Sequence, residues 1–287
     1  NLTLRANSIV KEVIYDKTEK KATGVIVIDT ETKEETKYYA RIIFLNASAI
    51  ATAAVLLNSA SEAFPNGLGN SSDQVGHNLM DHVVNEGTYG TFEGLKDKYY
   101  EGRSPGTIYV PRFQNLKESN EKVDFIRGYG IQGKGERANW QSRQTSGFGV
   151  ELKEQLAKPG EWKISLGGRG ESLPNYDNKI TLDYQNRDKW GMPLVKVDFN
   201  YGPNEEAMMQ HMTKESESIL KKAGFTNVGS YRTSPDPGSA VHEMGTARMG
   251  HDPKTSVLNK HNQMHDVKNV FITDGSCMTS SGCQNPS

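Results

Sequence analysis

A histidine and an asparagine near the end of the chain have side chains suited to handling an alcohol group. His242 opens the glycine-containing stretch His242-Glu243-Met244-Gly245-Thr246-Ala247-Arg248-Met249-Gly250, and Asn285 follows 43 positions later in an Asn-Pro pair. An imidazole, with an ordinary pKa of about 6.5, can accept a proton near neutral pH, and an amide can hold a hydroxyl oxygen without titrating. The small residues after His242 allow the backbone to approach a ligand closely. A third element, Asp274-Gly275, ends a short apolar run between them.

The other histidines lack such a setting. One falls within a predicted helix and five stand in polar loop segments. The histidines with a neighbour four or five residues away have no carboxylate cluster or third histidine that would complete a metal site, so we expect no metal. We interpret Val75–His82 as a polar loop at a domain boundary. The six histidines other than His242 are His77, His82, His211, His251, His261 and His265.

Length and charge restrict the function. A chain of 287 residues is long enough for about two domains with a real core. The 35 acidic and 34 basic residues nearly cancel, so no field of one sign would recruit nucleic acid or an anionic membrane. The balance favours a small neutral partner. The longest apolar stretch, Ile42 to Leu57, contains polar residues and is too short to span a bilayer.

The two cysteines and the first residues bear on processing. Cys277 and Cys283 could form one local bridge, but two buried free thiols are the favoured interpretation. The chain opens with Asn1-Leu2-Thr3-Leu4 and not with Met, and no signal peptide is present as given. We therefore expect a fragment whose N-terminal part is missing. A targeting signal could belong to that part, so the compartment stays open between the periplasm and the cytoplasm of a bacterium.

The N-terminal part predicts strands followed by a helix. Ile9–Tyr15 and Gly24–Ile28 are β-branched runs separated by a polar turn. Arg41–Leu45 is a continuous apolar run, typical of a strand covered on both faces. It leads through Asn46-Ala47-Ser48 into Ala49–Leu57, whose composition favours a helix. Such a unit binds nucleotide phosphates in α/β sheets, but the pattern fits an ordinary strand–helix step at least as well.

The middle of the chain predicts a second, mostly antiparallel region. From Val83 to about Phe199, short strands alternate with glycine and aromatic residues, which indicates a sheet with helices on one side. Ile180–Tyr184 and Leu194–Phe199 flank a turn and should pair as a hairpin. Pro203–Ala223 is the clearest helix, with proline near its start and Gly224 as its stop. The tyrosines and tryptophans of this region could line a sugar pocket or belong to the core.

These stretches, in this order, resemble the glucose–methanol–choline (GMC) family of flavin oxidoreductases, and within it the sugar-oxidising branch that includes glucoside 3-dehydrogenases. The resemblance covers about residues 1–82 and 171–287 and leaves the middle more variable. Asn46 and Ser48 replace the family's usual Ala and Gly, and the family's glycine-rich FAD loop and terminal helix are absent. Besides the C-terminal motifs, the resemblance rests on Asn66-Gly67-Leu68-Gly69-Asn70 and Val75-Gly76-His77-Asn78-Leu79-Met80-Asp81-His82.

The resemblance implies an α/β (α+β) fold. Part of a Rossmann-like FAD-binding domain would comprise residues 1–82, and an antiparallel-sheet substrate domain with helices on one side would comprise residues 83–235. A catalytic segment, residues 236–287, would return to the FAD-binding domain.

The resemblance also implies the chemistry. FAD would accept a hydride at its N5 atom while a secondary alcohol of a sugar or glycoside becomes a ketone. His242 would act as the general base and Asn285 would position the hydroxyl group. Asp274 would meet the ribityl or pyrophosphate part of FAD, largely through following backbone N–H groups, and Val10 would meet the adenine through its main chain. The cofactor-binding residues so implied are Val10, Asn46, Ala47, Asp274, Gly275, Asn285 and Pro286.

Partners and alternatives follow from the same resemblance. The partners would be a sugar or glycoside, the missing N-terminal part, and an electron acceptor such as a cytochrome c or a small accessory subunit. One alternative is a truncated, catalytically silent module that binds a sugar or is purely structural. Another is an oxygen-using pyranose oxidase. The sequence leaves open which sugar and which carbon are attacked, and whether FAD is covalently attached.

Overall fold

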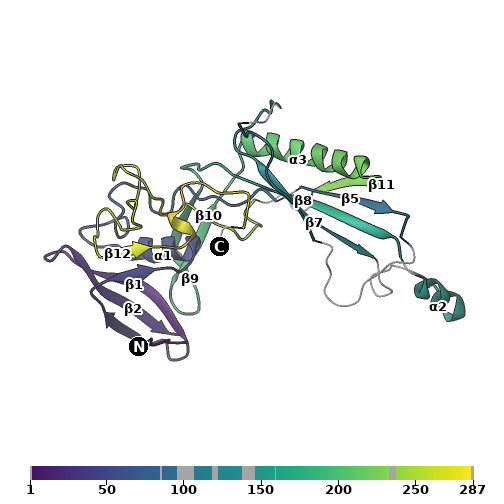
Figure 1. Cartoon of the computed structure of the whole chain (residues 1–287). Coiled ribbons are helices and arrows are strands. Elements are labelled where there is room, and N and C mark those ends of the chain that lie inside the picture. Colours follow the sequence, from purple (N-terminus) through teal and green to yellow (C-terminus); the bar gives the residue numbers. More distant parts are fainter. Residues whose placement is uncertain are drawn as a thin grey trace.

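The computed structural model describes residues 2–84, 86–95, 107–117, 122–137, 146–158, 160–232 and 237–285. Figure 1 shows two bodies joined by extended segments, one around β1, β2, α1 and β12, the other around a broad sheet covered by α3. The sheets are antiparallel except for one parallel pair, so the expected mixed α/β class is confirmed. Among the described residues, no helix has the length and apolar character needed to cross a membrane.

The first body begins with a three-stranded antiparallel sheet. Its strands are β1 (Ser8–Asp16), β2 (Lys21–Asp29) and β3 (Glu35–Tyr39), paired in that order. The strands expected at 9–15 and 24–28 are confirmed, and β3 was not predicted. One side of this sheet packs on the core through Val13 and Ala22.

A strand–helix unit follows and pairs with the end of the chain. β4 (Ile43–Leu45) leads into α1 (Ala49–Asn58), which confirms the predicted helix, and β12 (Val270–Ile272) runs parallel to β4. The expectation that 41–45 is covered on both faces is wrong for this chain. Phe44 is 59% exposed and stacks on Phe271 at 5.2 Å between ring centroids, because the parallel sheet has only these two strands among the described residues.

The predicted hairpin forms, but it joins the first body. β9 (Lys179–Arg187) pairs with β10 (Pro193–Asp198) as a separate two-stranded sheet. Ile180 packs with Ala53 of α1 and Leu79 in a small core of its own. The hairpin therefore lies with the N-terminal elements in space, although it was expected within the substrate domain. The predicted boundaries at 82 and 235 stay predictions.

The second body is a five-stranded antiparallel sheet with the order β11-β5-β8-β7-β6. Helix α3 covers one face, as expected, and α2 (Gly149–Ala157) lies beyond the end of the sheet (Figure 1). The bounds are β5 Glu86–Phe92, β6 Thr107–Val110, β7 Tyr129–Arg137, β8 Trp162–Gly170, α3 Pro203–Lys222 and β11 Thr226–Arg232.

Close packing between α3 and β8 decides which face of the sheet is available to ligands. Met208 and Met212 of α3 are fully buried, and a Cβ at Gly168 would lie 1.8 Å from the Met212 sulfur. Gly168 therefore leaves room for the helix. Because side chains alternate along a strand, Ser165, Gly167 and Arg169 point to the opposite face. We call this opposite side the open face.

Both cysteines are free and buried, which confirms the preferred interpretation. Burial raises the pKa of each thiol above its ordinary value. Cys277 belongs to the core of the first body.

Asn269 links the two sheets of the first body, and its loss should destabilise the fold. Its side chain accepts from the Ala22 N–H at 3.0 Å and donates to the Ala22 and Arg41 carbonyls at 2.7 and 2.9 Å. Asn269→Ala leaves these groups unpaired, at a cost of about 1–3 kcal/mol. We expect the thermal unfolding midpoint of the full-length protein to fall by several degrees. Asn66→Ala, at an exposed loop position, should leave the midpoint unchanged; equal midpoints for both variants would contradict this role.

Candidate active site

The predicted base, His242, is held by a buried carboxylate from a distant part of the sequence. Asp81 is 1% exposed. One of its oxygens accepts the backbone N–H groups of His82 at 2.8 Å and His242 at 3.0 Å, and the other accepts that of Ala240 at 3.0 Å. Burial raises the pKa of Asp81 above its ordinary value, while these three N–H groups oppose the rise. One side chain thus fixes residues 240–242 against residues 81–82.

The backbone next to this carboxylate is paired as well. Met80 and Met244 form an isolated antiparallel bridge, with both N–H to carbonyl distances at 2.9 Å. Gly245 has a φ of 97°, and a Cβ there would lie 2.2 Å from the Asn78 carbonyl oxygen. The small residue after His242 therefore permits a close approach within the protein, where the sequence had suggested an approach to a ligand.

The structure brings a second histidine to His242. The Nδ1 atoms of His82 and His242 lie 3.0 Å apart, and the rings meet edge to face with centroids 4.9 Å apart. His82 is fully buried, and its Nε2 contacts the Gly282 carbonyl oxygen. No role was predicted for His82, because its nearest histidine along the chain, His77, has a poor spacing for a metal.

These contacts determine the tautomers of both rings. A carbonyl oxygen can only accept, so the Nε2 of His82 carries the proton. Burial, foremost, and the charges of His242 and Arg169 lower the pKa of His82, while the Gly282 contact opposes this, so the ring is neutral near pH 7. Its Nδ1 is then an acceptor, and the Nδ1 of His242 must donate to it. The Nε2 of neutral His242 is left without a proton and can accept one.

Asn285 lies on the tail that contacts this pair. Gly282, three residues before it, supplies the acceptor for His82, and Cys283 is buried beside the Arg112–Glu171 ion pair. Asn285 itself is exposed. Its convergence with His242 on one cavity stays a prediction. Pro286 lies outside the described residues.

Four of the predicted cofactor residues come together at the carboxyl ends of the parallel strands. Asn46 and Ala47 follow β4, and Asp274 follows β12 and caps η1 (Gly275–Cys277). The two segments are joined where the Asn46 side-chain oxygen accepts from the Thr273 N–H at 3.0 Å. Ligands of α/β sheets bind at this edge. Val10 lies apart on β1, whose residues contact the other end of α1 through Asn58.

The side chain of Asp274 is already engaged. It accepts from the Thr52 hydroxyl at 2.6 Å, from the Ser276 N–H at 2.9 Å, and from the Ser276 hydroxyl. Any ligand at this edge would therefore meet mainly the backbone. Ser48 caps α1 with a φ of 79°, a left-handed conformation that glycine adopts without strain. This is one of the positions where the family usually has glycine.

The comparisons with known proteins agree with this geometry. Two protein-family models, both described as GMC oxidoreductase, match this sequence, one over residues 1–84 and the other over residues 174–287. The chain belongs to the GMC oxidoreductase family. The unmatched middle is the part expected to be variable. Members of this family are FAD flavoproteins and oxidoreductases.

Curated relatives support the assignment, and a solved structure shares the fold. The chain is 30% identical over 281 residues to 2-methyl-1,2-propanediol dehydrogenase of Mycolicibacterium austroafricanum, covering 93% of this chain and 48% of that protein. It is 26% identical to the fructose dehydrogenase large subunit of Gluconobacter japonicus, covering 88% and 45%. A crystal structure of formate oxidase has a TM-score of 0.64 at 16% identity, covering 97% and 57%. The chain thus spans about half the length of the relatives it matches.

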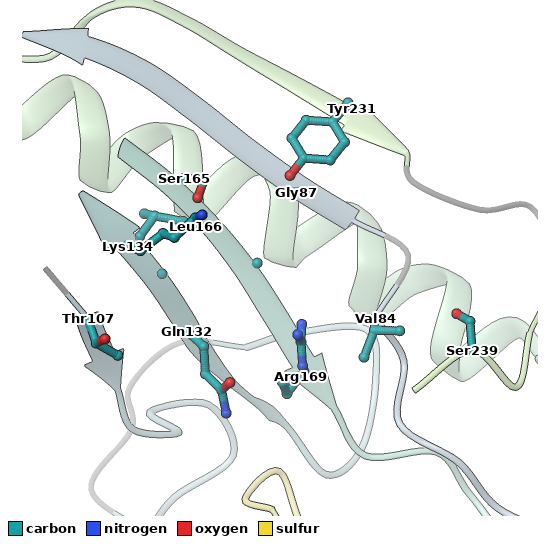
Figure 2. A pocket seen from close by; sticks show the side chains of 12 residues that line it. Val84, Gly87, Thr107, Gln132, Lys134, Ser165, Leu166, Arg169, Tyr231 and Ser239 are labelled. Carbon is teal, nitrogen blue, oxygen red and sulfur yellow. The ribbon is translucent and has the colours of Figure 1, made fainter. Parts of the chain in front are cut away.

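A cavity of about 680 Å³ in this GMC chain opens on the open face, and its lining does not include His82 or His242. Its size is typical of small-molecule sites. Figure 2 shows Gln132, Arg169, Lys134 and Tyr231 along it, with α3 behind the sheet. Val84 and Ser239 are among the residues that line the cavity. Val84 lies two residues after His82 in the sequence, and Ser239 lies three residues before His242. Among the described residues, no group of three or more histidine, cysteine or acidic side chains could hold a metal ion.

Sequence reasoning missed Asp81 and His82. Their signal was the stretch Asn78-Leu79-Met80-Asp81-His82, quoted for the family resemblance but interpreted as a polar loop. An acid and a histidine closing a motif whose other residues are buried could have marked the site, since buried charged groups are rare without partners.

The tautomer assignment predicts a specific NMR result. With histidine labelled by ¹⁵N in the full-length protein, His82 should appear as the Nε2–H form at neutral pH, and the neutral form of His242 should carry its proton on Nδ1, with His82→Gln and His242→Gln used for assignment. His82 should titrate below about 6.5. As the pH falls through that value, the unfolded chain gains a proton that folded His82 refuses, so the free energy of unfolding should decrease. An Nδ1–H form of His82 would refute the assignment.

Proposed function

We propose that the full-length protein oxidises a secondary alcohol of a sugar or glycoside to a ketone, with His242 as the general base and FAD as the cofactor. The observation that supports this most is the contact of His242 with neutral His82, which leaves the Nε2 of His242 free to take a proton. The family assignment and the polar cavity on the open face support the substrate class, since fructose dehydrogenase and paromamine 6'-oxidase are among the relatives.

The proton step can be assigned to stated atoms. The hydroxyl proton of the substrate passes to the Nε2 of His242, and the Nδ1–H of His242 stays bonded to His82. FAD, when bound, would supply the hydride acceptor. Asp81 keeps the ring in place by holding the His242 backbone N–H. General-base assistance of this kind typically contributes about 10²- to 10⁴-fold.

Asn285 would position the substrate. An amide can donate to and accept from a hydroxyl group while staying neutral, so it orients the C–H bond without competing for the proton. The tail that carries Asn285 is tied to His82 through Gly282, which supports a place close to the base.

The residues present fit an FAD-binding role. Asn46, Ala47, Asp274 and Gly275 would hold the cofactor at the β4–β12 edge, mainly through the backbone, and Val10 would contact the adenine. A Cβ at Gly275 would lie 2.7 Å from the Glu243 carbonyl oxygen, so the backbone is tightly placed there. The buried hydroxyl of Ser281 has no hydrogen-bond partner among the described residues, which is expected where a further group binds. Asn285 and Pro286 complete the proposed set.

The remaining partners are also proposals. The exposed Phe44 stacks on the partly buried Phe271, and this pair suits coverage by further elements of the full-length protein, because parallel sheets in α/β proteins are normally covered on both faces. Relatives described as a large subunit and as a gluconate 2-dehydrogenase flavoprotein support a separate acceptor, such as a small subunit or a cytochrome c. The similarity to glucoside 3-dehydrogenases stays a prediction.

Two alternatives make different predictions. A silent sugar-binding or structural module would be colourless where the proposed enzyme shows flavin absorbance. A 31% identity over 103 residues to pyranose 2-oxidase of Tricholoma matsutake favours an oxidase. Rapid reoxidation of the reduced flavin by oxygen would identify the oxidase.

Removing the base should slow the reaction and spare the cofactor. In full-length protein containing FAD, His242→Ala should lower the rate of flavin reduction by sugar at least about a hundredfold. Rapid-mixing absorbance measures this rate, and the flavin spectrum shows that FAD is retained. His261→Ala, in an exposed loop, is the control and should reduce at the normal rate. Near-normal reduction in His242→Ala would reject His242 as the base.

Changing Asn285 should impair positioning without removing the base. Asn285→Ala should lower the limiting rate of flavin reduction about ten- to a hundredfold, because one hydrogen bond to the reacting hydroxyl is lost. The dependence of the rate on pH should keep its midpoint, since the amide does not titrate. A shifted midpoint with an unchanged limiting rate would contradict the positioning role.

A further inference from the structure

The cavity on the open face carries positive charge without a matching acid. Its lining includes Arg169 and Lys134 and, among the described residues, no aspartate or glutamate. Lys134 forms an ion pair with Glu136 at 2.8 Å, further along β7. Arg169 is therefore the side chain whose charge is least compensated. The net charge of the chain, −1, hides this local excess.

Arg169 differs from a structural arginine close by in the fold. Arg112 forms an ion pair with Glu171 at 2.8 Å, as arginines in protein interiors usually do. The hydrogen bond of Arg169 goes to the adjacent Gly168 carbonyl at 3.0 Å, and no carboxylate of the described residues lies within ion-pair distance. A half-buried guanidinium with one hydrogen bond to a neutral carbonyl and no carboxylate partner is stabilised when a ligand supplies the countercharge.

Burial also disfavours the charged form of Arg169. It lowers the pKa of the guanidinium from its ordinary value, and among the described residues the charge of Tyr231 opposes this. The charge of Arg169 also lowers the pKa of His82, so the guanidinium lies at the histidine end of the cavity. A group bound by Arg169 would be close to the proposed reaction centre.

The rest of the open face suits hydroxyl groups. Gln132, Ser165 and Tyr231 offer neutral donors and acceptors, and Figure 2 shows Gln132 beside Arg169 on the neighbouring strand. Gly87 and Gly167 lack side chains, and Tyr231 lies over Gly87. A floor with neutral polar groups, and with Arg169 as the one lining cation without an ion pair among the described residues, matches a sugar ring that carries one acidic substituent.

We propose that Arg169 binds a carboxylate of the substrate, so that the favoured substrate is an acidic sugar, such as a hexuronic acid, its glycoside or an aldonic acid. This rests on the proposed function and specifies its substrate class. The planar fork of arginine matches a carboxylate in a bidentate geometry. A phosphate would call for more positive charge than one guanidinium, since the second cation of the cavity is paired with Glu136.

The test compares two ligands that differ only in this group. Methyl β-D-glucuronide carries a carboxylate where methyl β-D-glucoside carries a hydroxymethyl group. With the FAD-containing full-length protein, the concentration dependence of flavin reduction gives a dissociation constant and a limiting rate. D-Gluconate and D-glucose 6-phosphate are measured in parallel, as an aldonate and as the phosphate alternative.

We expect the wild type to prefer the glucuronide or gluconate over the neutral glucoside. Arg169→Met should weaken binding of the acidic ligand about 10- to 100-fold with little change in the limiting rate, and should leave the neutral glucoside unaffected. Arg169→Lys should recover part of the loss. Lys163→Met removes a positive charge from the same face of β8, about 20 Å away, and should change nothing.

Each of the other outcomes would reject a specific claim. Equal loss for acidic and neutral ligands would mean that Arg169 serves the fold or the cofactor, and a changed flavin spectrum in Arg169→Met would point to the cofactor. Preference for the phosphate would overturn the carboxylate. Reduction by sugars without any preference for acids would reject this inference and keep the proposed function. No reduction by any sugar would reject the proposed function itself.

Discussion

The geometry of the site depends on one buried carboxylate. Asp81 binds the N–H groups of His82, Ala240 and His242, and so joins segments 160 residues apart in the chain. Each bond to a charged acceptor is worth about 1.5–3 kcal/mol, whereas burying the charge costs several kcal/mol. The three bonds offset part of that cost, and burial still raises the pKa of Asp81 above its ordinary value. Removing any of the three donors would leave the buried carboxylate less compensated, so the carboxylate favours the arrangement in which all three segments are in place.

Elements that depend on local sequence were predictable. The strands β1 and β2, the helices α1 and α3, and the β9–β10 hairpin follow from β-branched runs, alanine and leucine content, proline, and turn residues within each segment. The segments that cover each element could not be predicted in this way. Arg41–Leu45 was expected to be covered on both faces, but Phe44 is exposed, because coverage depends on segments elsewhere in the protein. The hairpin's place against α1 likewise depends on distant contacts.

The site shows the same division between local and distant information. His242 was recognisable from its motif, and Asn46, Ala47, Asp274 and Gly275 were recognisable as a set. His82 was not, because spacing compares a histidine with its neighbours along the chain, and its actual neighbour is far away. The role of Gly245 changed for a similar reason: its close contact is with Asn78. The net charge could not locate Arg169 either, since a balanced total says nothing about where an arginine without an ion pair lies.

The tail and the base are coupled through a single ring. His82 can accept from His242 only while its own proton stays on Nε2, and the Gly282 carbonyl holds it there. Without the Gly282 carbonyl against Nε2, no contact would favour one tautomer of His82 over the other. The contact with His82 would then no longer determine which ring nitrogen of neutral His242 lacks a proton. Because Asn285 lies three residues beyond Gly282, the position of the tail that orients His242 would also bring the amide proposed to position the substrate. The proposed proton acceptor and hydroxyl-binding group would then be assembled by the same contact.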